Sequence, residues 1–156
     1  MIEQGGGGHI VNTASGAGLF PVPFFAAYST TKFGVVGLSE TLRAEAAMHG
    51  IGVSVLCPGA VSSTNFARNA RVAVSAKRPS AKEQKKTWHQ TWNRIMTMRN
   101  YSPAKVAAAV VKGVEKNKPI IRVGSDTFIG DFLIRSSRRL YLMGLERTYR
   151  LLKRYL

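Results

Sequence analysis

Three short apolar runs, each bounded by glycine or proline, are the clearest pattern in the chain. They cover residues 9–13, 51–57 and 119–123, and their β-branched composition predicts buried strands. Between the first two runs, residues 25–48 are rich in Ala, Leu and Glu and predict one long helix that stops at His49-Gly50. Strand, helix and strand with short links indicate a parallel βαβ unit, and therefore an α/β fold.

The second half of the chain predicts further helices. Ser102-Pro103 is typical of a helix start, with Ser102 as the N-cap, and helical spacing continues to about Asn117. A last helical region covers residues 127–155, as one helix or as two helices broken near Gly144. At about 100° per residue, its apolar side chains share one face opposite the arginines and lysines: Leu133, Ile134, Leu140, Tyr141, Leu145, Leu151, Leu152 and Tyr155. Residues 60–100 are polar, basic and weakly periodic, and we expect helical pieces there without fixed bounds.

Composition excludes several classes of protein. The 156 residues are enough for one domain with its own core. A single cysteine excludes a disulfide framework and a cysteine-based zinc site, and the three histidines show no metal-ligand spacing. No apolar run approaches the roughly 18 residues that span a bilayer. Because Met1 is followed by Glu3 and four glycines rather than by a signal peptide, a cytoplasmic location is expected.

The net charge of +15 is concentrated in one part of the chain. Residues 1–64 carry a net charge of −1, whereas residues 65–156 carry 21 basic and 5 acidic residues, a net charge of +16. Such asymmetry is found in proteins that bind nucleic acid, an anionic membrane or an acidic partner. It is also found in proteins whose basic face meets only water, so the charge alone leaves these alternatives open.

Two side chains of the predicted long helix form a candidate catalytic pair. Tyr28 and Lys32 are four residues apart, so they lie one turn apart on one helix face. An ammonium beside a phenol favours the phenolate, which suits general acid–base work on an alcohol or a carbonyl. Ser15 follows the first predicted strand, and Pro58-Gly59 follows the second. Because ligands of open parallel sheets bind outside the carboxyl ends of the strands, these features are expected to border one crevice.

Together these motifs resemble the short-chain dehydrogenase/reductase family. The resemblance covers residues 8–64 well and rests on three runs whose order and spacing match the family's Ser, Tyr-x-x-x-Lys and Pro-Gly motifs: Ile10-Val11-Asn12-Thr13-Ala14-Ser15, Tyr28-Ser29-Thr30-Thr31-Lys32 and Val55-Leu56-Cys57-Pro58-Gly59-Ala60-Val61. It implies a partial Rossmann-like fold, the C-terminal part of a doubly wound parallel sheet with about three strands and flanking helices. Residues 1–124 would form this part, with residues 60–100 as the variable substrate region. Residues 125–156 would be a basic amphipathic helical extension.

The resemblance also implies an NAD(P)-dependent oxidoreductase that interconverts a secondary alcohol and a carbonyl. Tyr28 would be the general acid or base, Lys32 would favour its phenolate and bind the nicotinamide ribose, and Ser15 would hold the substrate oxygen. Pro58, Gly59 and Val61 would line the nicotinamide, and Ser63 would contact the cofactor. A fairly apolar small-molecule substrate would meet a pocket shaped by Phe66, Trp88, Trp92 and Met96, although a packed helix face is an open alternative for the two tryptophans.

Some family motifs have no counterpart in the 156 residues. These are the first strand, its Thr-Gly-x-x-x-Gly-x-Gly turn and the residue that selects NAD or NADP. Glycines 5–8 do not replace the turn, because they precede a strand, whereas a phosphate-binding glycine turn follows one. We therefore expect the chain to be the carboxyl-terminal portion of a longer enzyme, with an unpaired edge on its first strand and no readable preference between NAD and NADP.

Other classes of function remain open. The basic C-terminal helix is typical of peripheral attachment to an anionic membrane surface, and equally of a lid over the substrate site or an oligomer contact. Nucleic-acid binding is a weaker alternative, because no recognition motif accompanies the charge. An inactive remnant that serves as an interaction module is a further alternative. For a full-length enzyme the resemblance implies a homo-oligomer, in which Gly34 and Gly37 would permit close packing of the long helix.

Overall fold

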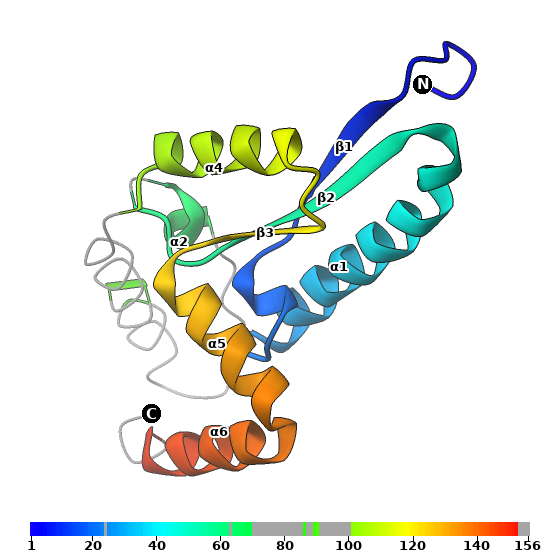
Figure 1. Ribbon diagram of the computed structural model, residues 1–156. Helices are drawn as coiled ribbons and strands as arrows, with labels where there is room; N and C mark the ends of the chain where they lie inside the picture. The colour runs from blue at the N-terminus through cyan, green and yellow to red at the C-terminus, as the bar shows by residue number, and fades with distance from the viewer. Residues whose placement is uncertain (24, 63, 70–85, 87–88, 91–100, 153–156) are drawn as a thin grey trace.

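A three-stranded parallel sheet forms the centre of the molecule (Figure 1). A computed structural model describes residues 1–23, 25–62, 64–69, 86, 89–90 and 101–152. Its strands are β1 (Gly8–Thr13), β2 (Ile51–Pro58) and β3 (Ile120–Val123), in the order β1-β2-β3. All three predicted strands and the parallel α/β fold are therefore confirmed. Within the described residues, no strand pairs with the outer edge of β1.

Helices cover both faces of the sheet. The long helix α1 (Ala26–Ala46) connects β1 to β2, and α4 (Pro103–Glu115) precedes β3 on the opposite face (Figure 1). Because successive side chains of a strand alternate between the faces, β2 contributes to two cores. Val53, Val55 and Cys57 belong to clusters with residues of α1 or the loop before it, whereas Leu56 joins β3 and α4.

The boundaries of these helices follow local signals in the sequence. The Ser102 hydroxyl accepts the Lys105 N–H at 3.3 Å, as expected for the N-cap of α4. After α1, a short 3₁₀ helix η2 (Ala47–His49) ends at Gly50, whose left-handed backbone (φ 66°) is one that glycine adopts without strain. Of the helical pieces expected in residues 60–100, α2 (Phe66–Asn69) is described. Trp88, Trp92 and Met96 lie outside the described residues.

The C-terminal region forms two helices, but they do not separate near Gly144. They are α5 (Ser125–Ser136) and α6 (Arg138–Leu152), and the break lies at Ser137. Ser137 has an extended backbone, and its hydroxyl accepts the Leu140 N–H at 3.3 Å, which satisfies one of the free donors at the start of α6. Gly144 lies inside α6. None of the described helices is long and apolar enough to cross a membrane.

The break also overturns the expectation of one apolar face across residues 127–155. Ile134 is buried in α5, and Tyr141 and Leu145 are partly buried in α6. Leu140 and Leu151, which were expected on the same face, are 67% and 60% exposed. An extended residue between two helices interrupts the helical phase, so a single wheel does not apply to both.

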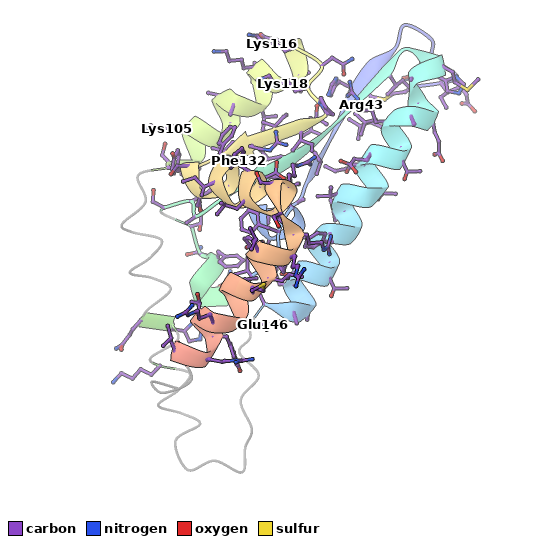
Figure 2. All side chains as sticks on the ribbon, turned by 60° about the horizontal axis from the view of Figure 1, so that its bottom comes forward. Arg43, Lys105, Lys116, Lys118, Phe132 and Glu146 are labelled. Carbon is purple, nitrogen blue, oxygen red and sulfur yellow. The ribbon has the colours of Figure 1, made fainter. Side chains whose placement is uncertain are left out.

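An arginine of α1 ties that helix to the far side of the sheet. Arg43 Nη1 donates to Val53 O of β2 at 2.6 Å and to Asn117 Oδ1 at 2.9 Å, and Arg43 Nη2 donates to Asn117 O at 2.9 Å. Asn117 lies in the turn between α4 and β3, and Figure 2 shows Arg43 between α1 and this turn. One side chain thus connects elements that are 74 residues apart.

A buried carboxylate fixes α5 against β3. Asp131 is 4% exposed, and its Oδ2 accepts from Arg122 Nε at 2.7 Å and contacts Arg122 Nη2 at 2.6 Å. Its Oδ1 accepts from Arg135 Nε at 2.7 Å. Since Arg122 lies on β3 and Asp131 on α5, this ion pair fixes the position of α5 relative to the sheet.

Replacing Asp131 with Ala is expected to lower the free energy of unfolding by about 3 kcal/mol, because it leaves the partly buried Arg122 without its carboxylate. Replacing Arg135 with Ala removes a partner whose side chain is 61% exposed, and less than about 1 kcal/mol should be lost. Urea unfolding followed by circular dichroism measures both. Equal losses in the two variants would contradict the assigned role of the Arg122–Asp131 pair.

The side chain of His9 on β1 is linked by hydrogen bonds to β2 and to the turn before β3. We expect this histidine to make the free energy of unfolding depend on pH. His9 Nε2 lies 2.7 Å from Ser54 Oγ, whose proton is donated to Lys118 O at 2.6 Å. Burial, and then the charge of Arg43, lower the pKa of His9 below 6.5. The folded state therefore favours neutral His9. Its contribution to stability is complete above pH 6.5 and is lost as the pH falls toward the lower folded pKa.

Urea unfolding midpoints measured above and below pH 6.5 should show this loss of stability in the natural chain. The loss should be smaller in His9→Gln, which keeps a donor but does not titrate. An identical pH dependence in both proteins would show that His9 does not cause it.

Candidate active site at the carboxyl edge of the sheet

The three strands end at the same level, so their following loops share one edge of the sheet. Thr13 is paired with Leu56, and Ala14 N–H donates to Leu56 O at 2.8 Å. On the other side of β2, Gly59 N–H donates to Val123 O at 2.8 Å. Parallel pairing therefore brings the loop after Ser15 and the Pro58-Gly59 turn to this edge.

Tyr28 and Lys32 lie on the first turns of α1 at this edge. Lys32 Nζ is 5.6 Å from the centre of the Tyr28 ring, and both residues are half-buried. The ammonium also donates to Thr13 O, the last carbonyl of β1, at 3.1 Å. One hydrogen bond leaves two of its three N–H donors for other acceptors. The pair is therefore positioned both by helical spacing and by the end of the neighbouring strand.

Aromatic rings surround the Tyr28 side chain. Phe25 lies edge-on to it with ring centres 5.9 Å apart, and Phe66 does so at 5.5 Å. Phe66 comes from α2, after β2, so the chain returns over the start of α1 at this point. Apolar neighbours of this kind favour an apolar ligand beside the phenol.

Ser15 lies where β1 passes into the 3₁₀ helix η1 (Gly16–Gly18). Its hydroxyl oxygen accepts the Ala17 N–H at 3.3 Å and so caps this short helix. Among the described residues no hydrogen bond joins Ser15 to Tyr28, so the structure brings Tyr28 and Lys32 together but does not link Ser15 to them directly. Because the Ser15 hydroxyl acts as an acceptor in this cap, its own proton is available for an incoming oxygen.

The Pro58-Gly59 turn is held by an acidic residue that the sequence motifs did not indicate. Asp126, in the first turn of α5, accepts the Ala60 N–H through Oδ2 at 3.0 Å. A Cβ at Gly59 or at Gly124 would collide with this carboxylate, and Gly124 also has φ 104°. One feature of the sequence could have indicated Asp126. It follows the third predicted strand and therefore lies at the same edge of the sheet as Ser15 and the Pro58-Gly59 turn.

Two residues after this turn, Val61 has a backbone donor with no partner among the described residues. Val61 O accepts the Thr64 hydroxyl at 3.3 Å, and the next residue, Ser62, donates its N–H to Tyr101 O at 2.9 Å. Val61 N–H has no hydrogen-bond partner within the described part of the chain. A half-buried free N–H of this kind suits an amide carbonyl of a ligand. Ser63, the other expected contact in this loop, lies outside the described residues.

Cys57 is a poor candidate for chemistry at this edge. Cys57 is completely buried in the core on the α1 face, and this burial raises the pKa of its thiol to about 11. A thiol with such a pKa is protonated at neutral pH and is not a nucleophile. In the parts of the chain that the structure describes, no three His, Cys, Asp or Glu side chains gather to hold a metal ion.

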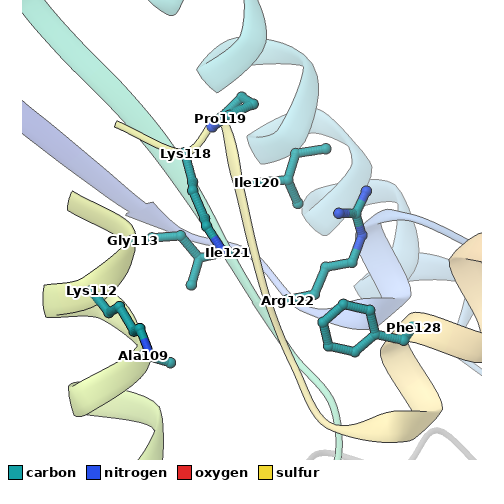
Figure 3. Close-up of a pocket in the computed structure, with 9 residues that line it drawn as sticks. All are labelled: Ala109, Lys112, Gly113, Lys118, Pro119, Ile120, Ile121, Arg122 and Phe128. Carbon is teal, nitrogen blue, oxygen red and sulfur yellow. The ribbon is translucent and has the colours of Figure 1, made fainter. Parts of the chain in front are cut away.

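A groove of about 420 Å³ lies elsewhere, between α4 and the outer edge of β3 (Figure 3). It is lined by Ala109, Lys112, Gly113, Lys118, Pro119, Ile120, Ile121, Arg122 and Phe128. None of the candidate catalytic or cofactor-binding residues lines it. The groove is therefore a feature of the sheet edge and is separate from the candidate active site.

Comparison with known proteins gives consistent matches. Residues 1–75 match the sequence profile of the short chain dehydrogenase family. The probable oxidoreductase EphD of Mycobacterium tuberculosis is 34% identical over 129 residues, which are 82% of this chain and 21% of EphD. The putative oxidoreductase SadH of the same organism is 35% identical over 150 residues, which are 92% of this chain and 51% of SadH.

The same likeness is found among solved structures. A short-chain dehydrogenase/reductase from Burkholderia phymatum in complex with NAD superimposes with a TM-score of 0.74 at 28% identity, over 90% of this chain and 51% of that chain. The chain thus spans about half the length, or less, of the proteins it matches here.

Replacing Asp126 with Ala is expected to loosen the Pro58-Gly59 turn, because the partly buried Ala60 N–H loses its acceptor at a cost of about 1–3 kcal/mol. The Ala60 amide should then exchange its hydrogen faster. Asp126→Asn keeps an oxygen in the same place and should lose less than half as much stability. Hydrogen exchange and urea unfolding measure these effects, and an unchanged exchange rate in Asp126→Ala would refute the assigned contact.

Proposed function

The chain belongs to the short-chain dehydrogenase/reductase family, and on that premise we propose that it carries the catalytic residues of an NAD(P)-dependent oxidoreductase. The reaction interconverts a secondary alcohol and a carbonyl. The observation that carries the proposal is the pairing of Tyr28 with Lys32, whose ammonium is held at the carboxyl end of β1 by Thr13 O at 3.1 Å. A Tyr-x-x-x-Lys pair on the solvent-exposed face of an ordinary helix would have no backbone carbonyl of a strand beside its ammonium.

Proton transfer is the task of the Tyr28 phenol. In carbonyl reduction its Oη gives a proton to the substrate oxygen, and in alcohol oxidation it takes that proton. The Lys32 ammonium stabilises the phenolate that is present on one side of this transfer. Ser15 donates its free hydroxyl proton to the same substrate oxygen and stabilises the charge that develops there.

The residues of the turn after β2 fit the nicotinamide end of the cofactor. NAD or NADP, when bound, supplies or accepts the hydride. The remaining N–H donors of Lys32 bind the ribose hydroxyls, the free Val61 N–H binds the carboxamide, and Pro58 and Gly59 line the ring. Ser63 is a further cofactor contact in this proposal. The Burkholderia phymatum relative, which is in complex with NAD, supports a nicotinamide cofactor for this family fold.

The substrate is a small, fairly apolar alcohol or carbonyl compound. The two phenylalanine rings that stand edge-on to Tyr28 support this class, because they offer no hydrogen bonds beside the reacting oxygen. The active protein is a homo-oligomer in this proposal. Gly34 and Gly37 support it, because in the structure nothing lies within 4 Å of the position of a Cβ at either glycine, so that side of α1 is open to a neighbouring helix.

A chain that has lost catalysis and serves as an interaction module is the competing class. It requires no affinity for the nicotinamide end of the cofactor. Nicotinamide mononucleotide contains only this end, so it probes the residues described here without the adenosine half of NAD.

Nicotinamide mononucleotide is expected to bind the 156-residue chain weakly, and Lys32→Met should weaken it by about tenfold or more, because a charge-assisted hydrogen bond is worth about 1.5–3 kcal/mol. Ligand-observed NMR measures the binding. Lys112→Met, a change of the same kind on α4, is the control and should bind like the natural chain. Absence of binding to the natural chain would favour the non-catalytic class.

In the catalytically active protein, Tyr28→Phe should lower the rate of carbonyl reduction by at least about 100-fold, the usual share of a general acid. The phenylalanine keeps the ring contacts with Phe25 and Phe66, so folding and binding of nicotinamide mononucleotide should not change. Following NAD(P)H absorbance with a ketone substrate measures the rate. Retention of most activity would refute Tyr28 as the acid.

A further inference from the structure

One side of α6 combines exposed apolar side chains with arginines. Its three large apolar residues are 55% to 67% exposed, and the three arginines beside them are exposed as well. At about 100° per residue, these six residues fall on one side of the helix, here called the α6 outer face: Arg139, Leu140, Met143, Arg147, Arg150 and Leu151.

The opposite side of α6 is packed, so the helix presents its outer face in a fixed position. Tyr141 Oη donates to Pro21 O at 3.0 Å, and its ring stands edge-on to Phe20 with centres 6.3 Å apart. Burial raises the pKa of Tyr141, so its phenol stays a neutral donor. α6 lies at the end of the molecule away from α4 (Figure 1). The exposed leucines are therefore not those of a loosely attached tail.

The charge of the chain argues against coverage of this face by the chain itself or by a second copy. Glu146 is the one acidic residue in the sequence of α6, which also contains four arginines, and on the same wheel it lies beside Arg139 at the border of the α6 outer face. The whole chain has 8 acidic residues against 23 basic ones, and Asp126 and Asp131 are already engaged by Ala60 and by two arginines. Six acidic residues then remain in the whole sequence, too few to match the arginines of the α6 outer face in a second copy.

The apolar side chains distinguish between two anionic partners, a nucleic acid and a lipid bilayer. A nucleic acid would pair with the arginines but would leave Leu140, Met143 and Leu151 against phosphates or water. A bilayer that contains anionic lipids satisfies both sets, because leucines enter the acyl boundary while guanidinium groups meet the phosphates. We propose that the α6 outer face docks this chain on the surface of an anionic lipid bilayer, with α6 lying in the plane of the interface.

The neighbouring helix has an exposed apolar set that does not support the same inference. Phe128, Ile129, Phe132 and Leu133 of α5 are 48% to 69% exposed, and Figure 2 labels Phe132 on this helix. The arginine nearest to them in the helix, Arg135, is bound to Asp131. Charge therefore does not indicate a partner for α5, whereas it does for α6.

Docking through α6 would place the candidate active site close to the bilayer. Tyr141 binds Pro21, and Pro21 lies in the loop that runs from Ser15 to α1. Substrates dissolved in the membrane would then be near this loop, a consequence that rests on the proposed function. The docking itself does not depend on catalysis.

Co-sedimentation of the 156-residue chain with lipid vesicles tests the proposal. The chain should bind vesicles of phosphatidylcholine mixed with phosphatidylglycerol at low salt, bind them less at high salt, and bind pure phosphatidylcholine poorly. The triple variant Arg139→Gln, Arg147→Gln and Arg150→Gln should partition about 100-fold less, because each arginine near such a surface is worth about 1 kcal/mol.

Two further variants make the result specific. Lys112→Gln, Lys116→Gln and Lys118→Gln together remove the same charge at and after the end of α4, and Figure 2 shows Lys116 and Lys118 away from α6. This variant should change partitioning by less than about threefold, because these lysines are not part of the α6 outer face. Leu140→Ser with Leu151→Ser should weaken binding about tenfold or more, because about 25 cal/mol is lost per Å² of buried apolar surface.

Circular dichroism should show unchanged helix content in all variants, since every altered side chain is exposed. Equal losses of vesicle binding in the arginine and lysine variants would show that the attraction depends on net charge alone. Full vesicle binding by the leucine variant would show that no apolar side chain enters the bilayer. Binding of an oligonucleotide without binding of anionic vesicles would assign the face to nucleic acid. Each of these three results would overturn the proposal. None of these three results bears on whether the chain binds nicotinamide mononucleotide.

Discussion

The central position of β2 is the constraint on which the rest of the structure depends. It pairs with β1 on one side and β3 on the other, and Val53, Val55 and Cys57 are at most 1% exposed. Because both neighbours take their register from this strand, all three strands end at one edge. Tyr28 and Lys32 reach the same edge because they lie on the first turns of α1, which begins after β1 ends and runs back to the start of β2. The location of the candidate site is thus a consequence of parallel pairing around one buried strand.

Helix α5 links this edge to the C-terminal region. Asp126 in its first turn accepts the Ala60 N–H of the turn after β2, and Asp131, further along, holds Arg122 of β3. α6 then follows and returns to the loop after Ser15 through Tyr141. Side chains of α5 therefore connect the proposed cofactor turn with the sheet, and α5 leads directly into the basic helix α6. A shift in the position of α5 would therefore affect the proposed cofactor turn, the sheet and the basic helix.

Local signals predicted the strands, the helix start at Ser102 and the spacing of the Tyr28–Lys32 pair, because each depends on neighbours within a few residues. They did not predict the break at Ser137 or the exposure of Leu140 and Leu151. A serine that caps a helix and a serine inside one look alike in a polar, basic stretch, and a wheel drawn across the break assigns the wrong face. Asp126 and Arg43 were also missed, because their partners are 66 and 74 residues away.

The sequence by itself determined the order of the elements, the motif spacing that indicates the chemistry, and the concentration of positive charge after residue 64. These depend on periodicity and composition, which are properties of short segments. Only the tertiary structure decided that Asp126 holds the Gly59 turn, that Val61 N–H has no partner among the described residues, and that one side of α6 is exposed. These features arise where distant segments pack together, and the free energy of such packing depends on shape and burial that no single segment contains.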